Sequence, residues 1–326
     1  MLKPLVLSLC SLTLACSAPG GASEKLTLLN VSFDPTRELY QEVNRAFAAS
    51  WAEQHSGQIV EINQSHRGSA KQARAVVDGL EADVVTLALG FDVDAIVRAG
   101  VIDPGWAAEL PSDSSPYASP IVFLVRAGNP KNIRGWDDLV RGDVQVITPS
   151  PKTSGGARWA YLGAWAQARA KNGDPAQARA FIERLYRNVP VLDSGARGAT
   201  TTFTERQIGD VLIAWESEAR LALEKLGSER VELVIPERTI LAEPVVAVVD
   251  RVVDRRQTRA VAETYLRFLY SEPGQRIIAA HHFRPRTPAL ETGGFSSIKE
   301  LGGWKAAHDI HFADGAIFDQ ISERAP

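Results

Sequence analysis

The sequence predicts a mixed α/β protein built as two lobes. Over residues 26–89, short apolar strands alternate with amphipathic helices, a pattern typical of a parallel sheet covered by helices. A segment rich in proline and serine, residues 110–120, interrupts this alternation, which resumes from residue 121. With 326 residues, 45% of them apolar and 23% charged, the chain is long enough for two cores.

Strand ends in the first lobe are followed by helix-starting residues. Asp34 is expected as an N-cap, with Pro35 at the first helical position. Ser69 and Gln72 have the spacing of a capping box. The expected strands are residues 26–31, 59–62 and 83–89.

The second lobe repeats the alternation, and the chain then returns to the first lobe near residues 242–249. The expected strands are residues 121–125, 144–147, 189–193, 211–215 and 231–235. Predicted helices follow Gly156 and cover residues 176–186 and 216–226, and the C-terminal region is mainly helical. We therefore assign residues 24–120 and 243–326 to the first lobe and residues 121–242 to the second.

The first 22 residues have the pattern of an export signal. Lys3 precedes an apolar run too short to span a bilayer comfortably, and Gly20, Gly21 and Ala22 offer a small-residue cleavage site. A second interpretation is cleavage before Cys16 with a lipid attached there, which would tether the protein to a membrane. Both interpretations place the mature protein in the periplasm.

Composition excludes several classes of function. The formal net charge is -3, and no basic run with interleaved aromatic residues occurs, so we expect no nucleic-acid partner. Cys10 and Cys16 are the two cysteines of the chain, and both lie in the leader. The mature chain therefore has no disulfide, cysteine nucleophile or cysteine metal ligand.

Small polar residues recur where predicted strands pass into helices. Asp34, Ser69, the segment 154–156 and the segment 194–196 all occupy such positions. A helix N-terminus exposes free N–H groups, and glycine lets an anion approach them closely. Two facing lobes would bring these junctions to one cleft, which predicts a site for a small oxyanion. Ordinary helix caps with flexible entry loops remain the alternative for each junction taken alone.

Other chemistries have weaker support in the sequence. Lys152 and Thr153 lack the upstream glycine of a phosphate-binding P-loop. His281 and His282 point in different directions on a helix and lack a third ligand, so we expect no metal site.

His308 and His311 are interpreted as surface residues on a polar terminal segment. Glu216 and Glu218 are interpreted as favourable charges at a helix start rather than as an acid and base pair. No catalytic motif is present, so we expect no enzyme activity and no cofactor. An exported hydrolase of sulfate or phosphate esters is the alternative of another class, and it would require a nucleophile or a metal cluster.

Five segments carry a specific resemblance to a known family. They are residues 28–40, 64–72, 151–159, 193–198 and 209–216. Together they closely resemble the periplasmic sulfate-binding proteins of bacterial ABC importers, and the resemblance covers essentially the whole mature chain. It implies a two-lobed, type II solute-binding fold, each lobe a mostly parallel sheet flanked by helices, with sulfate held between the lobes. It also implies a monomer that delivers sulfate to membrane permease subunits.

The resemblance also implies the ligand residues. The implied donors are the main-chain N–H groups of Asp34, Ser69, Gly155, Gly156 and Ala196, the Ser69 hydroxyl and the Trp215 indole. The related thiosulfate-binding proteins differ at the positions of Gly156, Ala196 and Trp215, so the pattern favours sulfate, with thiosulfate or another tetrahedral oxyanion as the alternative. Arg67 and Ala70 depart from the usual sulfate pattern, in which glycines are common there, and Lys152 is expected outside the ligand shell.

Overall fold

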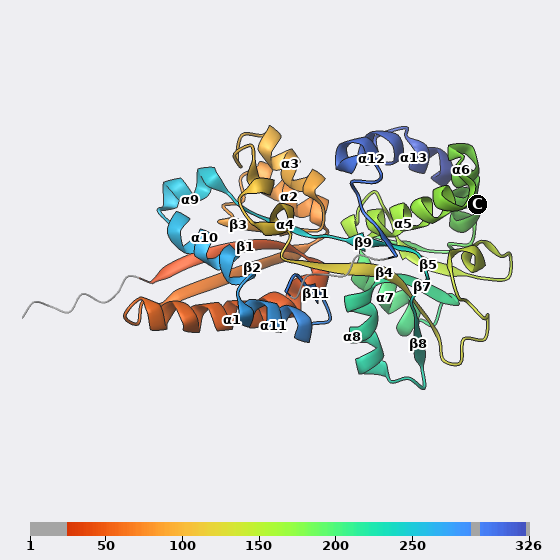
Figure 1. Ribbon diagram of the computed structural model, residues 1–326, viewed down its shortest axis with the longest axis horizontal. Coiled ribbons are helices and arrows are strands. Elements are labelled where there is room, and N and C mark those ends of the chain that lie inside the picture. Colours follow the sequence, from red (N-terminus) through yellow and green to blue (C-terminus); the bar gives the residue numbers. More distant parts are fainter. Residues whose placement is uncertain (1–24, 288–293, 324–326) are drawn as a thin grey trace, which may run out of the picture.

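The computed structural model describes residues 25–287 and 294–323, which form two α/β halves side by side (Figure 1). Each half has its own sheet flanked by helices, so the predicted α/β class is confirmed. The export signal, residues 1–22, and the candidate lipid site at Cys16 lie outside the described residues.

The first half is built on a four-stranded sheet in the order β10-β3-β1-β2. β1 is parallel to β2 and β3, whereas β10 is antiparallel to β3. Its strands are β1 (Leu26–Phe33), β2 (Val60–Arg67), β3 (Val84–Leu87) and β10 (Val245–Val248). Its helices are η1 (Asp34–Thr36), α1 (Arg37–Gln54), α2 (Ser69–Val77), α3 (Gly90–Arg98), η2 (Trp106–Ala108), α4 (Pro111–Ser114), α9 (Asp250–Arg256), α10 (Arg259–Phe268) and α11 (Glu272–Ala280). Strands β1 and β3 are rich in buried aliphatic residues, which explains their position inside the sheet.

The second half has an eight-stranded sheet with the path β12-β9-β4-β7-β5-β6, and β11 and β8 also pair with β4. Its strands are β4 (Tyr117–Arg126), β5 (Val146–Pro149), β6 (Leu192–Asp193), β7 (Val211–Trp215), β8 (Val231–Val234), β9 (Thr239–Ala242), β11 (Arg284–Pro285) and β12 (Phe295–Ser296). Its helices are η3 (Trp136–Val140), α5 (Gly155–Asn172), α6 (Pro175–Arg187), α7 (Ala196–Thr204), α8 (Glu216–Leu226), α12 (Gly303–His311) and α13 (Ile317–Ser322).

This second sheet is mixed, which corrects the expectation of a mostly parallel sheet. The long strand β4 runs antiparallel to β7, β8, β9 and β11. Parallel pairing is confined to β5 with β6 and β7, and to β12 with β9. The parallel part, β5 to β7, is the part that supplies the helix entrances described below.

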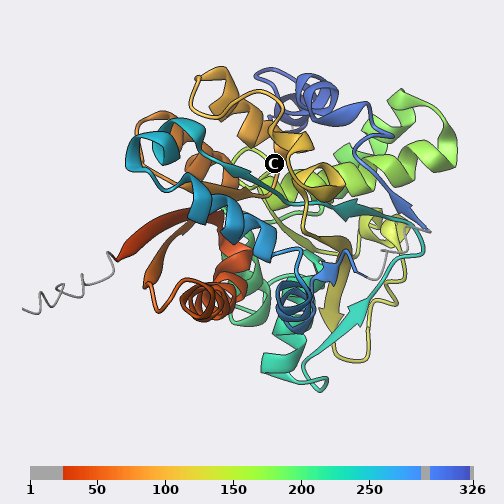
Figure 2. The same ribbon diagram turned by 60° about the vertical axis from the view of Figure 1, so that its left-hand side comes forward.

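Extended segments connect the halves. The chain enters the second half along β4 and returns between β9 and β10, which are separated by Glu243 and Pro244 (Figure 1). After α11 it crosses again, because β11 pairs with β4 and β12 pairs with β9. Helices α12 and α13 then lie beside α5 and α6 (Figures 1 and 2). The division of the chain into lobes at residues 120 and 243 stays a prediction.

The C-terminal helices bury His311 and partly cover His308, two residues that the sequence analysis interpreted as surface residues. His311 is only 4% exposed and lies 4.4 Å from the Trp165 ring, measured between centroids. The His308 ring stacks on Phe91 at 4.0 Å. The surface interpretation was wrong for His311, because α12 packs against α5 and α3, a contact that the local polarity of residues 303–311 does not indicate.

Candidate functional site

The predicted binding residues lie at the carboxyl ends of five strands. Asp34 opens η1 after β1, and Ser69 opens α2 after β2. Gly155 and Gly156 are the first two residues of α5 after β5, and Ala196 opens α7 after β6. Trp215 ends β7 directly before α8. This is the edge of an α/β sheet at which ligands usually bind.

The two halves meet at these strand ends. A Cβ atom placed on Gly155 would lie 3.1 Å from the Ser69 Cβ, and one on Gly156 would lie 3.0 Å from the Trp215 Nε1. The Phe33 and Trp215 rings are 5.5 Å apart, and a Cβ on Gly195 would lie 3.9 Å from the Asp34 Oδ2. The structure therefore brings all six predicted residues into one neighbourhood.

Five main-chain N–H groups in this neighbourhood have no hydrogen-bond acceptor among the described residues. They belong to Asp34, Ser69, Gly155, Gly156 and Ala196. The first turn of any helix has free N–H groups. Here the free groups of several helices from both halves come together, which is the arrangement that an anion needs.

Local sequence explains why these N–H groups stay free. The N-cap residues of α2 and α7 are Gly68 and Gly195, which have no side chain that could accept a hydrogen bond. The α5 N-cap is Ser154, and its hydroxyl accepts from the Ala157 N–H at 3.3 Å, which leaves Gly155 and Gly156 unpaired. By contrast, Asp174 caps α6 in the ordinary way.

Ser69 does not form the capping box predicted from the sequence. It is the first residue of α2 rather than its N-cap, and its hydroxyl donates to the Asp92 Oδ2 at 2.5 Å. The Ser69 Oγ also accepts from the Ala88 N–H at 3.1 Å. Burial raises the pKa of Asp92, while the Ser69 hydrogen bond and the charge of Arg158 oppose that rise. Asp92 therefore fixes the Ser69 side chain, a role without a signal in the local sequence.

Trp215 is 2% exposed, and its indole N–H lies 3.4 Å from the Gly156 carbonyl oxygen, a long hydrogen bond. The indole lines a small cavity of about 10 Å³ together with Gly156 and Ala196. Such a volume holds about one water molecule. The weak indole contact is readily exchanged for a stronger acceptor.

Close approach explains the glycines in this region. A Cβ on Gly155 would also lie 3.0 Å from the Ala88 Cβ, so alanine there would press on the other half. A Cβ on Gly68 would lie only 2.7 Å from the Thr153 carbonyl oxygen. Gly68 was missed in the sequence analysis, because its neighbour is 85 positions away in the printed sequence.

Charged side chains surround a cleft of about 330 Å³ beside the strand ends, lined by residues of both halves such as Pro35, Ser217 and Phe283. The Arg197 Nη2 lies 2.6 Å from the Glu38 Oε2 and links α7 to α1. Burial raises the pKa of Glu38, but the hydrogen bond and charge of Arg197 outweigh it and leave the pKa lowered. Burial raises the pKa of Glu218, which also lines this cleft, to about 7, against the charge of Arg197.

The other candidates from the sequence have structural partners. His281 and His282 face Glu42 and Glu224 at 2.8 and 3.0 Å. Glu216 is buried and accepts hydrogen bonds from Arg220 and Arg284. Arg67 is exposed at the end of β2. Across residues 25–287 and 294–323, no cluster of three or more potential metal ligands occurs, and no helix is both long and apolar enough to span a membrane.

Two α/β halves whose helix N-termini and strand ends face one another define a two-lobed binding protein. The model of the family described as bacterial extracellular solute-binding protein matches residues 38–284, and the chain belongs to this family.

Similar proteins agree with this assignment. The sulfate-binding protein of Escherichia coli (strain K12) is 54% identical over 323 residues, covering 96% of this chain and 98% of the relative. The thiosulfate-binding protein of Pseudomonas aeruginosa is 44% identical over 322 residues, covering 95% and 97%. The solved structure of the sulfate-binding protein SubI from Mycobacterium tuberculosis H37Rv is similar with a TM-score of 0.79 and 33% identity, covering 88% of this chain and 99% of that one.

Proposed function

We propose that this protein is a receptor outside the cytoplasm that binds one sulfate between its lobes and delivers it to the permease subunits of an ABC importer. The observation that carries the proposal is the convergence of five acceptor-free main-chain N–H groups, those of Asp34, Ser69, Gly155, Gly156 and Ala196. The names of relatives at 54% and 44% identity support a sulfur oxyanion as the ligand.

The donor set suits a fully ionised anion. Sulfate has no proton at neutral pH, so each of its oxygens accepts hydrogen bonds and a site of N–H donors satisfies it. A hydrogen phosphate would bring an O–H that finds no acceptor among these amides, and a buried unpaired group of this kind costs about 1–3 kcal/mol. The proposed site therefore discriminates by protonation state as well as by shape.

Two side chains complete the proposed site by exchanging their present acceptors for the anion. The Ser69 hydroxyl now donates to Asp92, and the Trp215 indole now faces the Gly156 carbonyl. An oxygen of the doubly charged sulfate is a stronger acceptor than a neutral carbonyl, so the indole N–H gains by donating to the anion.

Binding and lobe closure are the whole proposed activity, with no reaction catalysed. An anion that touches donors of both lobes binds the closed form more tightly and shifts the population toward it. The proposal needs no nucleophile and no cofactor. Incubation with 4-nitrophenyl sulfate and phosphate tests the hydrolase alternative, and release of nitrophenol in proportion to protein would support that alternative.

Calorimetric titration of the purified mature protein tests the ligand. We expect saturable binding of one sulfate per chain, weaker binding of thiosulfate, and no heat with phosphate at the same protein concentration. Tighter binding of thiosulfate or molybdate than of sulfate would reassign the ligand within the same class. Absence of binding to every oxyanion would contradict the receptor function.

The mature form and its assembly are separate parts of the proposal. Mass measurement of the exported protein distinguishes a chain cleaved after Ala22 from one that begins at a lipidated Cys16. Size-exclusion chromatography with light scattering tests the expected monomer. Binding of the sulfate-loaded protein to permease subunits in membrane vesicles tests the partner.

A further inference from the structure

The loop before α5 is held from outside the binding neighbourhood by the C-terminal helices. The Lys152 ammonium lies 2.8 Å from both carboxylate oxygens of Asp319 on α13. It also donates to the Phe312 carbonyl oxygen, at the end of α12, at 3.2 Å. Lys152 and Asp319 are 167 positions apart, so this contact joins distant parts of the chain.

Both partners of this ion pair are themselves fixed. The Gly315 N–H donates to the Asp319 Oδ2 at 2.8 Å, and the Lys152 hydrogen bond lowers the pKa of Asp319. The side chains of Lys152 and Asp319 are 31% and 21% exposed, so the pair is partly shielded from water. A partly shielded ion pair fixes the positions of its two side chains better than a fully exposed pair does.

Contacts of Arg158 also hold the same loop in place. Arg158 on α5 is 8% exposed, and its Nε donates to the Pro151 carbonyl oxygen at 2.9 Å. Its guanidinium lies 5.1 Å from the centre of the Phe312 ring. The loop is therefore held between α5 on one side and the segment from α12 to α13 on the other.

This loop directly precedes the two glycine amides of the site. The Ser154 N–H donates to the Ser150 carbonyl oxygen at 2.9 Å, which forms a tight turn that ends at Ser154, directly before Gly155. The Thr153 carbonyl oxygen is the atom that faces Gly68 across the lobes. A shift of Lys152 would therefore move both the anion donors and the contact between the lobes.

We propose that Lys152 and Asp319 are positioning residues for the anion site, so that α13 sets its affinity without touching the ligand. This inference rests on the proposed function. The competing role for Lys152 is attraction of the anion by its positive charge alone. The two roles predict opposite effects of removing the negative charge of Asp319.

The variants Lys152→Met, Asp319→Asn and the double variant separate these roles by sulfate calorimetry. Positioning predicts that each single variant weakens binding roughly fivefold to twentyfold and that the double variant is no weaker than either, because both break one contact. Lys152→Arg keeps the ion pair and is expected to stay within about threefold of the wild type. Tighter binding by Asp319→Asn would establish charge attraction and overturn the proposal.

The exposed ion pair between Lys305 and Asp309 on α12 provides matched controls. Its atoms are 2.6 Å apart, and its side chains are 87% and 54% exposed. Lys305→Met and Asp309→Asn make the same charge changes on a neighbouring element, and we expect sulfate affinity to be unchanged. A lower melting temperature of Lys152→Met with unchanged affinity would assign the pair to stability alone.

Hydrogen exchange in the ligand-free protein gives a readout that does not depend on the ligand's identity. We expect faster deuterium uptake over residues 150–158 in Lys152→Met and Asp319→Asn, and wild-type uptake in Lys152→Arg. Unchanged uptake would contradict the positioning role. If the wild type failed to bind sulfate, the proposed function would be contradicted. Faster deuterium uptake in the two variants would still support the positioning role, because hydrogen exchange is measured without ligand.

Discussion

The Trp215 indole offers one N–H and no acceptor, and it is buried beside Gly156 and Ala196. Trp215→Phe keeps an aromatic ring next to Phe33 but removes the donor together with the nitrogen-containing ring of the indole. A hydrogen bond to a charged group contributes about 1.5–3 kcal/mol, so we expect sulfate affinity to fall roughly tenfold to a hundredfold by calorimetry. Unchanged affinity would limit Trp215 to packing.

Burial of the His311 side chain makes the stability of the protein depend on pH. Burial lowers its pKa to about 4, whereas an unfolded histidine titrates near 6.5. Between pH 4 and 6.5 the unfolded chain binds more protons than the folded protein does. The free energy of unfolding should therefore rise with pH over this range, and the contribution of His311 should be lost as pH falls toward 4.

The variant His311→Gln isolates that contribution. Glutamine stays neutral and can still reach the Tyr161 hydroxyl, which lies 3.2 Å from the His311 Nδ1. We expect the difference in unfolding free energy between pH 6.5 and 4 to shrink, by at most on the order of 3 kcal/mol. Urea denaturation at both pH values measures it, and an equal pH difference in wild type and variant would exclude His311 as its source.

The sequence predicted which residues donate hydrogen bonds in the site, but not the residues that hold these donors in place. Glycine and serine at helix entrances are visible as local patterns, so Ser69, Gly155 and Gly156 could be singled out. Asp92, which binds the Ser69 hydroxyl, lies 23 positions away, and Asp319 lies 167 positions from Lys152. These partners depend on packing between elements, for which a single sequence has no local pattern.

At the scale of elements, helix caps separate binding helices from supporting ones. Asp174 and Ser271 cap α6 and α11 with side-chain oxygens. The N-caps of α2 and α7 are glycines without such oxygens, so their first amides remain available. Strand positions were predicted well because apolar runs such as β7 are continuous. The antiparallel course of β4 was not predicted, because strand direction depends on the chain path rather than on composition.

Gly195 offers a test of the uncapped state of α7. Its φ of −165° is extended backbone open to other residues, and a Cβ would meet only the Asp34 Oδ2 at 3.9 Å. Gly195→Asp adds a carboxylate beside the Ala196 amide, and we expect sulfate binding to weaken at least about tenfold, because the charge repels the anion and competes for helix N–H groups. Calorimetry measures the change.

The neutral variant Gly195→Asn is the matched control for charge. It caps the helix about as well as aspartate, so a small loss with asparagine and a large loss with aspartate would show that the negative charge is responsible. Equal affinity in wild type and Gly195→Asp would place α7 outside the anion site.

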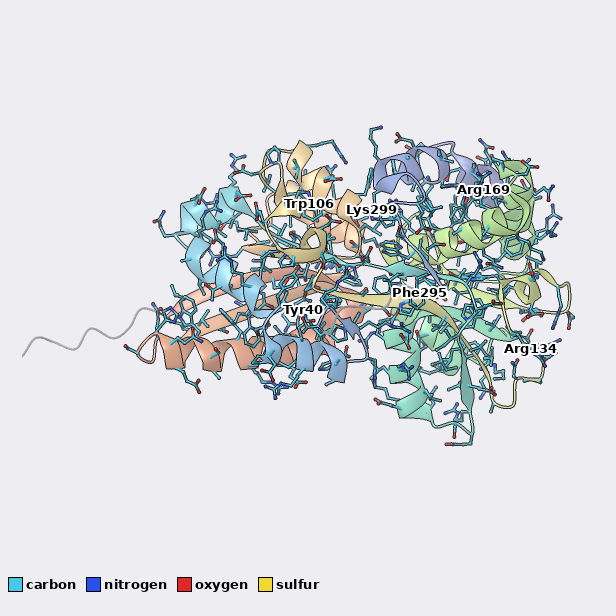
Figure 3. All side chains as sticks on the ribbon, viewed as in Figure 1. Tyr40, Trp106, Arg134, Arg169, Phe295 and Lys299 are labelled. Atoms are coloured by element: carbon cyan, nitrogen blue, oxygen red, sulfur yellow. The ribbon has the colours of Figure 1, made fainter. Side chains whose placement is uncertain are left out.

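At the scale of the whole molecule, the two halves touch through main-chain and side-chain contacts. The Trp159 indole donates to the Ala88 carbonyl oxygen at 2.9 Å. Lys299, which is labelled in Figure 3, pairs with Asp113 at 2.6 Å. The alternation of strands and helices predicted two α/β units. It did not predict that α12 and α13 pack beside α5, because that packing follows the third crossing of the chain.

Gly68 tests whether closeness of the lobes sets affinity. A Cβ there would lie 2.7 Å from the Thr153 carbonyl oxygen of the other half, a distance that forces backbone to move. Gly68→Ala should therefore hold the lobes apart, weaken sulfate binding at least about tenfold and reduce the compaction that sulfate causes in small-angle X-ray scattering. Gly142→Ala is the control, because nothing lies within 4 Å of its added Cβ. If Gly68→Ala bound sulfate with wild-type affinity and compacted fully, the close contact between Gly68 and Thr153 would not be needed for sulfate binding.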